Sequence, residues 1–139
     1  MNIFRFLTPK SRVEYIESDD SVRQAVEKMR YHHYVAIPIL DKDGTFVGTL
    51  RTDDLYKYFL ENGKFDYKAM ERDGVMKIYD PDYAPPILHS SSFEELVAYV
   101  TERNFAPIVD DRGCFIGLVL RRDVLEFLFA HYKKTAAPQ

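Results

Sequence analysis

The chain has one cysteine and no tryptophan, and none of its apolar runs approaches the ~18 residues of a membrane-spanning helix. The single cysteine, Cys114, excludes a framework of internal disulfides and fits a reducing compartment, so the cytoplasm is the expected location. Residues 1–10 lack the long apolar segment and the cleavage site of a secretory signal. The chain also lacks a large net charge, which is only −3 at pH 7. The protein therefore has no general attraction to nucleic acid or to an anionic membrane.

One segment of the chain occurs twice. Residues 104–129 repeat the pattern of residues 35–60 at a constant offset of 69 positions (123 minus 54). Each copy spans roughly 45 residues, which is near the limit for independent folding, so the two copies are expected to share a core. A repeat of this kind decides the architecture, and the cleft between the copies is the natural place for a ligand. The matching positions are Pro38 and Pro107, Asp41 and Asp110, Gly44 and Gly113, Gly48 and Gly117, and Asp54 and Asp123.

Each copy is predicted to contain three strands and two helices. Apolar residues of helical period follow Ser21 and Ser92, and each serine has Gln or Glu three positions later, the spacing of a capping box. The turn glycines Gly44 and Gly113 predict hairpins between the two strands that follow the first helix. The expected fold class is α+β, with tandem β-α-β-β-α repeats related by a pseudo-twofold axis. Extended segments are predicted around 13–16, 34–40, 45–50, 86–88, 105–109 and 114–120.

The repeat also predicts the boundaries within the chain. Residues 1–62 form the first repeat with its N-terminal segment, 63–85 a connector, 86–132 the second repeat and 133–139 a mobile tail. Within the connector, residues 65–76 are expected to form a helix that ends at Gly74.

The order of elements and the residues that occur twice resemble the CBS domain pair, the module named after cystathionine β-synthase. The likeness rests on the apolar-Pro-apolar-apolar-Asp runs at 37–41 and 106–110 and on the repeated glycines and aspartates, and it covers residues 13–131. The Arg-Arg pair at 121–122, together with Arg12 and the run 34–38, is similar to small stand-alone bacterial CBS proteins that bind adenine nucleotides such as cyclic di-AMP. No appended catalytic, transport or DNA-binding domain is recognised in the sequence.

The resemblance implies two clefts between the repeats, which often bind adenine nucleotides, and the pairing of two chains into a disc-shaped dimer. In members that bind nucleotide, a strand ending in Gly-x-x-Thr-x-x-Asp leads into a helix, whose N-terminus faces the phosphates together with the threonine. The aspartate takes the ribose hydroxyls. Asp54 and Asp123 match the aspartate, but Arg51 and Leu120 stand in place of the threonine. The threonine contact to phosphate is therefore lost in both copies.

Arginines offer a substitute, because a guanidinium matches phosphate oxygens with paired donors and a helix N-terminus favours an anion. Two alternatives stay open: the arginines are solvated surface charge, or the aspartates only favour the helix dipole. Apolar residues of the first strand of each hairpin are core residues first, although the resemblance implies that adenine is wedged against them. The predicted nucleotide-binding residues are Arg12, Tyr34, Ala36, Ile37, Pro38, Arg51, Asp54, Ala106, Pro107, Arg121, Arg122 and Asp123.

Other chemistry finds little support in the sequence. His32 and His33 are adjacent and lack neighbours at zinc-site spacing, so they are interpreted as favourable cations near a helix C-terminus. Asp53 and Asp54 have no activated nucleophile beside them. We therefore expect no catalytic residues, no metal and no cofactor. A basic groove interleaved with aromatics is missing, so neither nucleic acid nor a membrane is an expected partner.

The sequence thus predicts a regulatory, non-enzymatic module that binds AMP, ADP, ATP or cyclic di-AMP between its repeats and signals to an unidentified protein. Two other hypotheses remain: a ligand-free dimerisation or interaction module, and an enzyme that hydrolyses the bound nucleotide. A homodimer is predicted because aromatic-rich helix faces exceed what one small core can bury. The residues of these faces are Tyr56, Phe59, Leu125 and Phe129.

Overall fold

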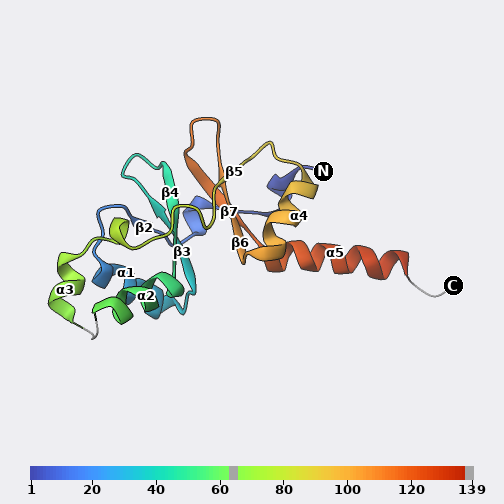
Figure 1. Ribbon diagram of the computed structural model, residues 1–139. Coiled ribbons are helices and arrows are strands. Elements are labelled where there is room, and N and C mark those ends of the chain that lie inside the picture. Colours follow the sequence, from blue (N-terminus) through green and yellow to red (C-terminus); the bar gives the residue numbers. More distant parts are fainter. Residues whose placement is uncertain (63–65, 137–139) are drawn as a thin grey trace.

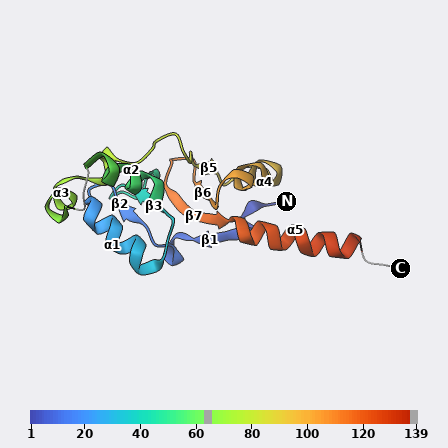
Figure 2. The same cartoon turned by 60° about the horizontal axis from the view of Figure 1, so that its bottom comes forward.

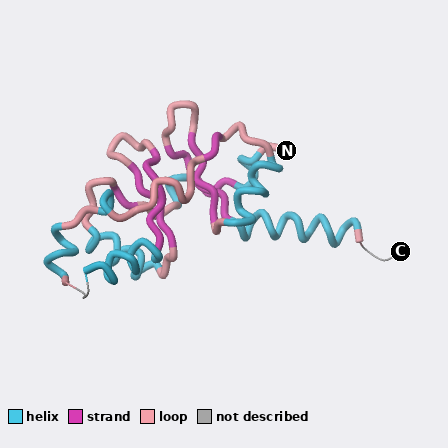
Figure 3. Tube along the Cα trace, in the orientation of Figure 1, coloured by secondary structure: helices cyan, strands magenta, loops and turns pink. Residues whose placement is uncertain are grey.

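A computed structural model describes residues 1–62 and 66–136 of the chain. The strands form two sheets that lie side by side in the middle of the molecule, with helices at both ends (Figures 1 and 3). The elements are η1 (Ile3–Phe6), β1 (Leu7–Pro9), η2 (Lys10–Arg12), β2 (Ile16–Glu17), α1 (Val22–His32), β3 (Ala36–Leu40), β4 (Phe46–Arg51), α2 (Thr52–Asn62), α3 (Tyr67–Arg72), η3 (Val75–Lys77), β5 (Ile87–Leu88), α4 (Phe93–Glu102), β6 (Phe105–Val109), β7 (Phe115–Leu120) and α5 (Arg121–Thr135).

Both predicted helix starts are confirmed. At α1, the hydroxyl of Ser21 accepts from the amide of Gln24 at 3.1 Å, and the Gln24 side chain accepts from the Ser21 amide at 2.8 Å. At α4, the hydroxyl of Ser92 accepts from the amide of Glu95 at 3.1 Å. These bonds satisfy amides that the helices themselves leave without partners. The α+β class and the β-α-β-β-α order of each repeat are likewise confirmed.

The two repeats meet at their hairpins. The amide of Phe46 donates to the carbonyl of Gly113 at 3.0 Å, and the amide of Phe115 donates to the carbonyl of Gly44 at 2.9 Å. This reciprocal pair is what a pseudo-twofold axis between the repeats requires. Beneath it lies a core built from both copies, as the length of one repeat predicts. Its buried members are Leu40, Phe46, Val109, Phe115 and Leu118.

The N-terminal segment joins the sheet of the second repeat, which the sequence did not predict. Strand β1 pairs with β7 in antiparallel fashion, so that sheet has the order β1-β7-β6-β5, whereas the first repeat has only β2-β3-β4. Figure 2 shows β1 beside β7, close to the start of α5. The approach is close at Gly117, where an added Cβ would lie 2.2 Å from the carbonyl oxygen of Thr8. Glycine at this position therefore allows the chain start to cross to the other repeat.

Two predicted boundaries change in the structure. The connector helix predicted over 65–76 is shorter: α3 begins after Asp66, whose side chain accepts from the amide of Lys68 at 3.0 Å, and it ends at Arg72. Helix α5 continues to Thr135, into the predicted tail, with Lys133 and Lys134 in its last turn. Cations there interact favourably with the C-terminal end of the helix dipole. Predicted connector residues 63–65 and tail residues 137–139 lie outside the described residues.

A buried tyrosine fixes α2 to the connector. The hydroxyl of Tyr58 donates to Oδ2 of Asp73 at 2.8 Å. Burial raises the pKa of Tyr58 to about 12, and the bond to Asp73 adds to this shift. The same bond lowers the pKa of the Asp73 carboxyl. None of the described helices combines the length and the apolar content needed to cross a membrane.

Candidate functional site

A cavity of about 370 Å³ lies between the two repeats, and we call it the open cleft. Its walls come from the N-terminal residues 8–14, from residues 33–38 at the start of β3, and from β6 and β7 of the second repeat. The volume falls in the range of about 300–1,000 Å³ that is usual for small-molecule sites. Its lining residues are Thr8, Arg12, Val13, Glu14, His33, Tyr34, Val35, Ala36, Pro38, Asn104, Phe105, Leu118 and Leu120.

The open cleft adjoins a second hollow at the start of α5. The two hollows share Asn104 and Leu120, and the second adds Arg121, Arg122 and Phe129 among its lining residues. Leu120, at the N-cap of α5, provides no side-chain hydrogen bond to the helix. The positive end of the α5 dipole, which favours anions, thus lies beside an apolar cleft.

The three charged residues at the start of α5 differ in their contacts. The Nε of Arg121 donates to the carbonyls of Val100 at 2.7 Å and of Arg103 at 3.0 Å, which ties α5 to the end of α4. Arg122 is exposed, and its Nε lies 4.0 Å from a carboxylate oxygen of Glu126. Asp123 is half-buried, and across residues 1–62 and 66–136 its carboxylate has no hydrogen bond or ion pair. An exposed ion pair such as Arg122–Glu126 contributes little to stability, so both Arg122 and Asp123 are available to a ligand.

The equivalent place in the first repeat, which we call the second cleft, is built around Arg51, the counterpart of Leu120. The guanidinium of Arg51 lies 3.1 Å from Oδ1 of Asp54 and 3.6 Å from Oδ2 of Asp80. Its Cζ lies 4.0 Å from the centre of the Tyr83 ring. Asp54 is 6% exposed and also accepts from the amide of Arg51 at 2.8 Å. Unlike Asp123, Asp54 is thus already bound by Arg51 of the same chain.

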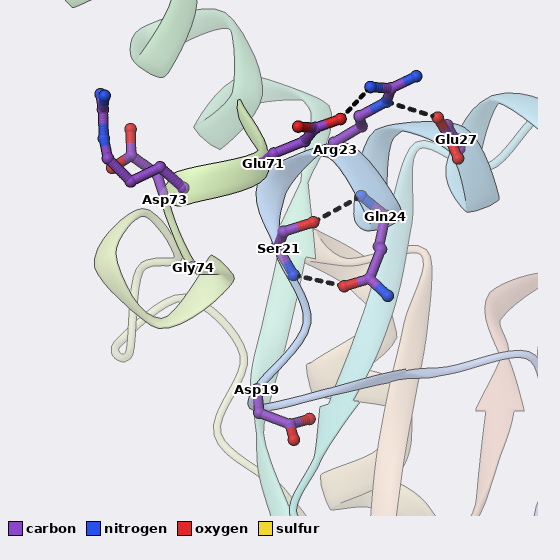
Figure 4. A pocket seen from close by; sticks show the side chains of 9 residues that line it. Asp19, Ser21, Arg23, Gln24, Glu27, Glu71, Asp73 and Gly74 are labelled. Carbon is purple, nitrogen blue, oxygen red and sulfur yellow. Dashed lines mark hydrogen bonds and ion pairs between the residues drawn. The ribbon is translucent and has the colours of Figure 1, made fainter. Parts of the chain in front are cut away.

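A third hollow, of about 600 Å³, lies between the start of α1 and the connector (Figure 4). Figure 4 shows Arg23 between Glu27 and Glu71, with which it forms ion pairs. The carboxylates of Asp19 and Asp73 also line this hollow. Because acidic side chains outnumber basic ones there, the hollow disfavours a phosphate-bearing ligand. The open cleft is the better candidate site.

Comparison with known protein families identifies the family to which the chain belongs. The sequence model of the CBS domain matches residues 6–61 and 83–130, which is more than half of the chain. The chain belongs to the CBS domain family. The two matched segments correspond to the two repeats, so the protein is a CBS pair, as its repeated residues suggested.

One curated relative of the CBS pair is the UPF0053 protein of Haemophilus influenzae, which is 22% identical over 134 residues. The match includes 95% of this chain but only 31% of the relative. The chain therefore spans about a third of the length of that relative.

Solved structures share the fold of this CBS pair. A CBS domain protein from Streptococcus pneumoniae TIGR4 is 22% identical, with a TM-score of 0.85 over 93% of this chain and 87% of the other. CbpB of Listeria monocytogenes, solved in complex with c-di-AMP, is 20% identical, with a TM-score of 0.83 over 94% and 96% of the two chains. CBSX2 in complex with AMP is 23% identical, with a TM-score of 0.75 over 94% and 98%.

The structure separates the predicted nucleotide-binding residues into groups. Arg51 and Asp54 lie in the second cleft, in contact with each other. Ile37 in β3 is fully buried, and Ala106 and Pro107 in β6 are buried as well. The residues brought to the open cleft and its adjoining hollow are Arg12, Tyr34, Ala36, Pro38, Arg121 and Arg122, with Asp123 following directly on α5.

Several lining residues of the open cleft were not predicted from the sequence. Thr8 and Glu14 come from the N-terminal segment, whose path beside β7 has no signal in the repeat. Asn104 and Leu118 lie within the second copy but carry no motif. At the offset of 69 positions, Asn104 corresponds to Val35 and Leu118 to Thr49. This repeat is the one signal in the sequence that could have pointed to these two residues.

Proposed function

We propose that this CBS pair is a regulatory module that binds an adenine nucleotide in the open cleft and signals to a partner protein. The observation that carries the proposal is the junction of an apolar cleft with the start of α5, where Arg122 makes an exposed ion pair of 4.0 Å with Glu126 and Asp123 has no partner among the described residues. Adenine suits the apolar walls at Ala36 and Phe105, ribose suits the Asp123 carboxylate, and phosphate suits Arg122 and the helix dipole. The complexes of CbpB with c-di-AMP and of CBSX2 with AMP support the same ligand class.

A thermal-shift panel tests the proposal. AMP, ADP, ATP and cyclic di-AMP are compared with GMP, GDP, GTP and cyclic di-GMP, which carry the same phosphates on another base. A ligand present at 100 times its Kd should stabilise the protein by about 2.7 kcal/mol and so raise the Tm. We expect at least one adenine nucleotide to raise the Tm while its guanine counterpart does not. A flat response to every nucleotide would favour the alternative, a dimerisation or interaction module without a nucleotide ligand.

Signalling would operate through the packing of the repeats. A nucleotide in the open cleft touches the N-terminal segment, β3 and the second repeat at once. It therefore stabilises one arrangement of these parts relative to others, which is a population shift. The regulated protein would bind one arrangement better than the other.

The proposal includes a homodimer, because equivalent faces of α2 and α5 carry exposed apolar side chains. Leu60 is 82% exposed and its counterpart Phe129 is 61% exposed, and Tyr56 and Leu125 are likewise exposed. Phe59, also expected on this face, is instead partly buried against the hydrophobic core of the first repeat. Burying such a patch favours association.

Sedimentation velocity tests the dimer. We expect the wild-type chain to sediment as a dimer at micromolar concentrations and the double variant Leu60→Asp/Phe129→Asp as a monomer. The matched control is Leu88→Asp, since Leu88 is also exposed but belongs to β5 rather than to α2 or α5. A wild-type monomer with and without nucleotide would contradict the prediction.

Phosphate binding by Arg122 predicts a dependence on salt. An exposed arginine–phosphate contact is screened over a Debye length of about 8 Å at physiological salt, whereas contacts to adenine are not. We expect Arg122→Ala to bind nucleotide more weakly and with a smaller loss of affinity between low and high salt. Arg121 is left intact because its Nε supports the end of α4.

Titration calorimetry at two salt concentrations measures both slopes. The control is Arg112→Ala, which removes an exposed arginine from the hairpin turn, outside the lining of the open cleft. Equal salt slopes for wild type and Arg122→Ala would show that Arg122 is only solvated charge.

A further inference from the structure

We infer that the connector closes the second cleft with a plug, the Tyr83 ring stacked on Arg51, so that each chain holds one nucleotide rather than two. This inference rests on the proposed function of the open cleft. The starting observation is that the open cleft and the second cleft, which occupy equivalent positions in the two repeats, are lined differently. Glu14 and Leu120 line the open cleft, while their counterparts, Tyr83 and Arg51, are packed against each other.

The Arg51–Tyr83 stack fills the positions that a nucleotide needs. The guanidinium lies over the tyrosine ring, a planar cation on an aromatic face, with 4.0 Å between Cζ and the ring centre. It is also bound to Asp54, whose counterpart Asp123 is the proposed ribose acceptor. A ligand would have to displace Arg51 from Asp54 before it could use that carboxylate.

The connector is held in this position from both repeats. The ring of Tyr79 lies against Gly48 of β4, where an added Cβ would be 2.5 Å from it. The carbonyl of Tyr83 accepts from Nε of Arg103 at 3.0 Å. The Arg103 guanidinium lies over the Tyr99 ring at 4.4 Å, and the Tyr99 hydroxyl donates to a connector carbonyl, that of Pro85, at 2.7 Å. Arg103 is the counterpart of Tyr34, which lines the open cleft.

Two buried polar atoms of β4 have no hydrogen-bond partner among the described residues. They are the hydroxyl of Thr49, a residue only 2% exposed, and the Nε of Arg51. The counterpart of Thr49 is Leu118, which lines the open cleft. Buried polar atoms without partners destabilise the closed arrangement. Removing the plug should therefore expose a cleft that already holds groups able to bind a polar ligand.

Counting bound AMP by equilibrium dialysis tests the inference. The variant Arg51→Leu/Tyr83→Ala gives the second cleft the leucine of the open cleft and removes the ring. The matched control is Arg23→Leu/Tyr67→Ala, which removes an arginine–tyrosine stack of 4.9 Å outside both clefts. Arg51→Leu alone, which frees Asp54 and introduces the leucine of the open cleft, serves if the double variant does not fold.

We expect one AMP per chain for wild type and control, and two for the variant without the plug. Two per chain for wild type would overturn the inference and leave the proposed function standing. One per chain for both wild type and the folded variant would also overturn it. Binding to the variant but not to wild type would support the plug and reject the open cleft as the nucleotide site. No binding to either would overturn the inference.

Discussion

Asp123→Ala is expected to lower the affinity for an adenine nucleotide about ten- to a hundredfold, since a hydrogen bond to a charged acceptor contributes about 1.5–3 kcal/mol. The reason is the difference between two equivalent aspartates. The carboxylate of Asp123 has no hydrogen bond or ion pair within the described parts of the chain. It is therefore available to the ribose hydroxyls, and its removal should leave the Tm of the unliganded protein nearly unchanged.

Asp54→Ala should give the opposite result. Asp54 binds the Arg51 guanidinium at 3.1 Å and the Arg51 amide at 2.8 Å, and it is nearly buried. Its loss should lower the free energy of unfolding by about 1–3 kcal/mol, because the part-buried Arg51 loses its nearest carboxylate. Nucleotide affinity should change little.

Calorimetry and urea denaturation on both variants measure the two effects. If Asp54→Ala weakens nucleotide binding as much as Asp123→Ala does, the assignment of the ligand to the open cleft is wrong.

Gly117→Ala is expected to lower the free energy of unfolding by roughly 2–4 kcal/mol, from backbone strain and overpacking together. Gly117 has a φ of +154°, and an added Cβ would lie 2.2 Å from the carbonyl oxygen of Thr8 and 3.1 Å from Cα of Pro9. The substitution should therefore push β1 away from β7. Because Thr8 and Arg12 line the open cleft, nucleotide affinity should fall as well.

Gly113→Ala is the matched control for this prediction. Gly113 has a φ of +83°, but an added Cβ would meet nothing within 4 Å. Gly113→Ala should lower the free energy of unfolding by roughly 1–2 kcal/mol, from backbone strain alone. Its nucleotide affinity should be unchanged. Equal losses of stability and equal affinities for the two variants would mean that the β1–β7 contact contributes nothing measurable.

The parts of the fold that depend on neighbouring residues were predictable. The capping residues Ser21 and Ser92 mark the starts of α1 and α4, and the turn glycines Gly44 and Gly113 mark the hairpins. These signals act within a few positions of the chain, and each of them occurs twice. The repeat also predicted the shared core, because one copy is too short to bury enough surface.

The crossing of β1 to the second repeat was not predictable in the same way. Leu7–Pro9 is a three-residue strand that contains a proline, with too few residues to show an alternating pattern. Its position depends on a distant glycine, Gly117, rather than on its own sequence. Thr8 and Glu14 therefore entered the candidate site only with the structure.

The difference between the two clefts could not be predicted from the repeat either. Reasoning from an internal repeat treats equivalent residues alike, so Arg51 and Asp54 were predicted to bind nucleotide together with Arg122 and Asp123. Tyr83 of the connector stacks on Arg51, whereas its counterpart Glu14 lines the open cleft. Whether an arginine meets a ligand or its own chain depends on such long-range contacts.

Determining the structure with an adenine nucleotide bound tests the central claim most directly. Crystals grown with AMP or cyclic di-AMP, whichever raises the Tm more, would locate the ligand. We expect the adenine between β3 and β6, beside Ala36 and Phe105, with the ribose at Asp123 and a phosphate at Arg122. The ring of Tyr83 should remain on Arg51. A nucleotide found beside Asp54 with the open cleft vacant would contradict this account.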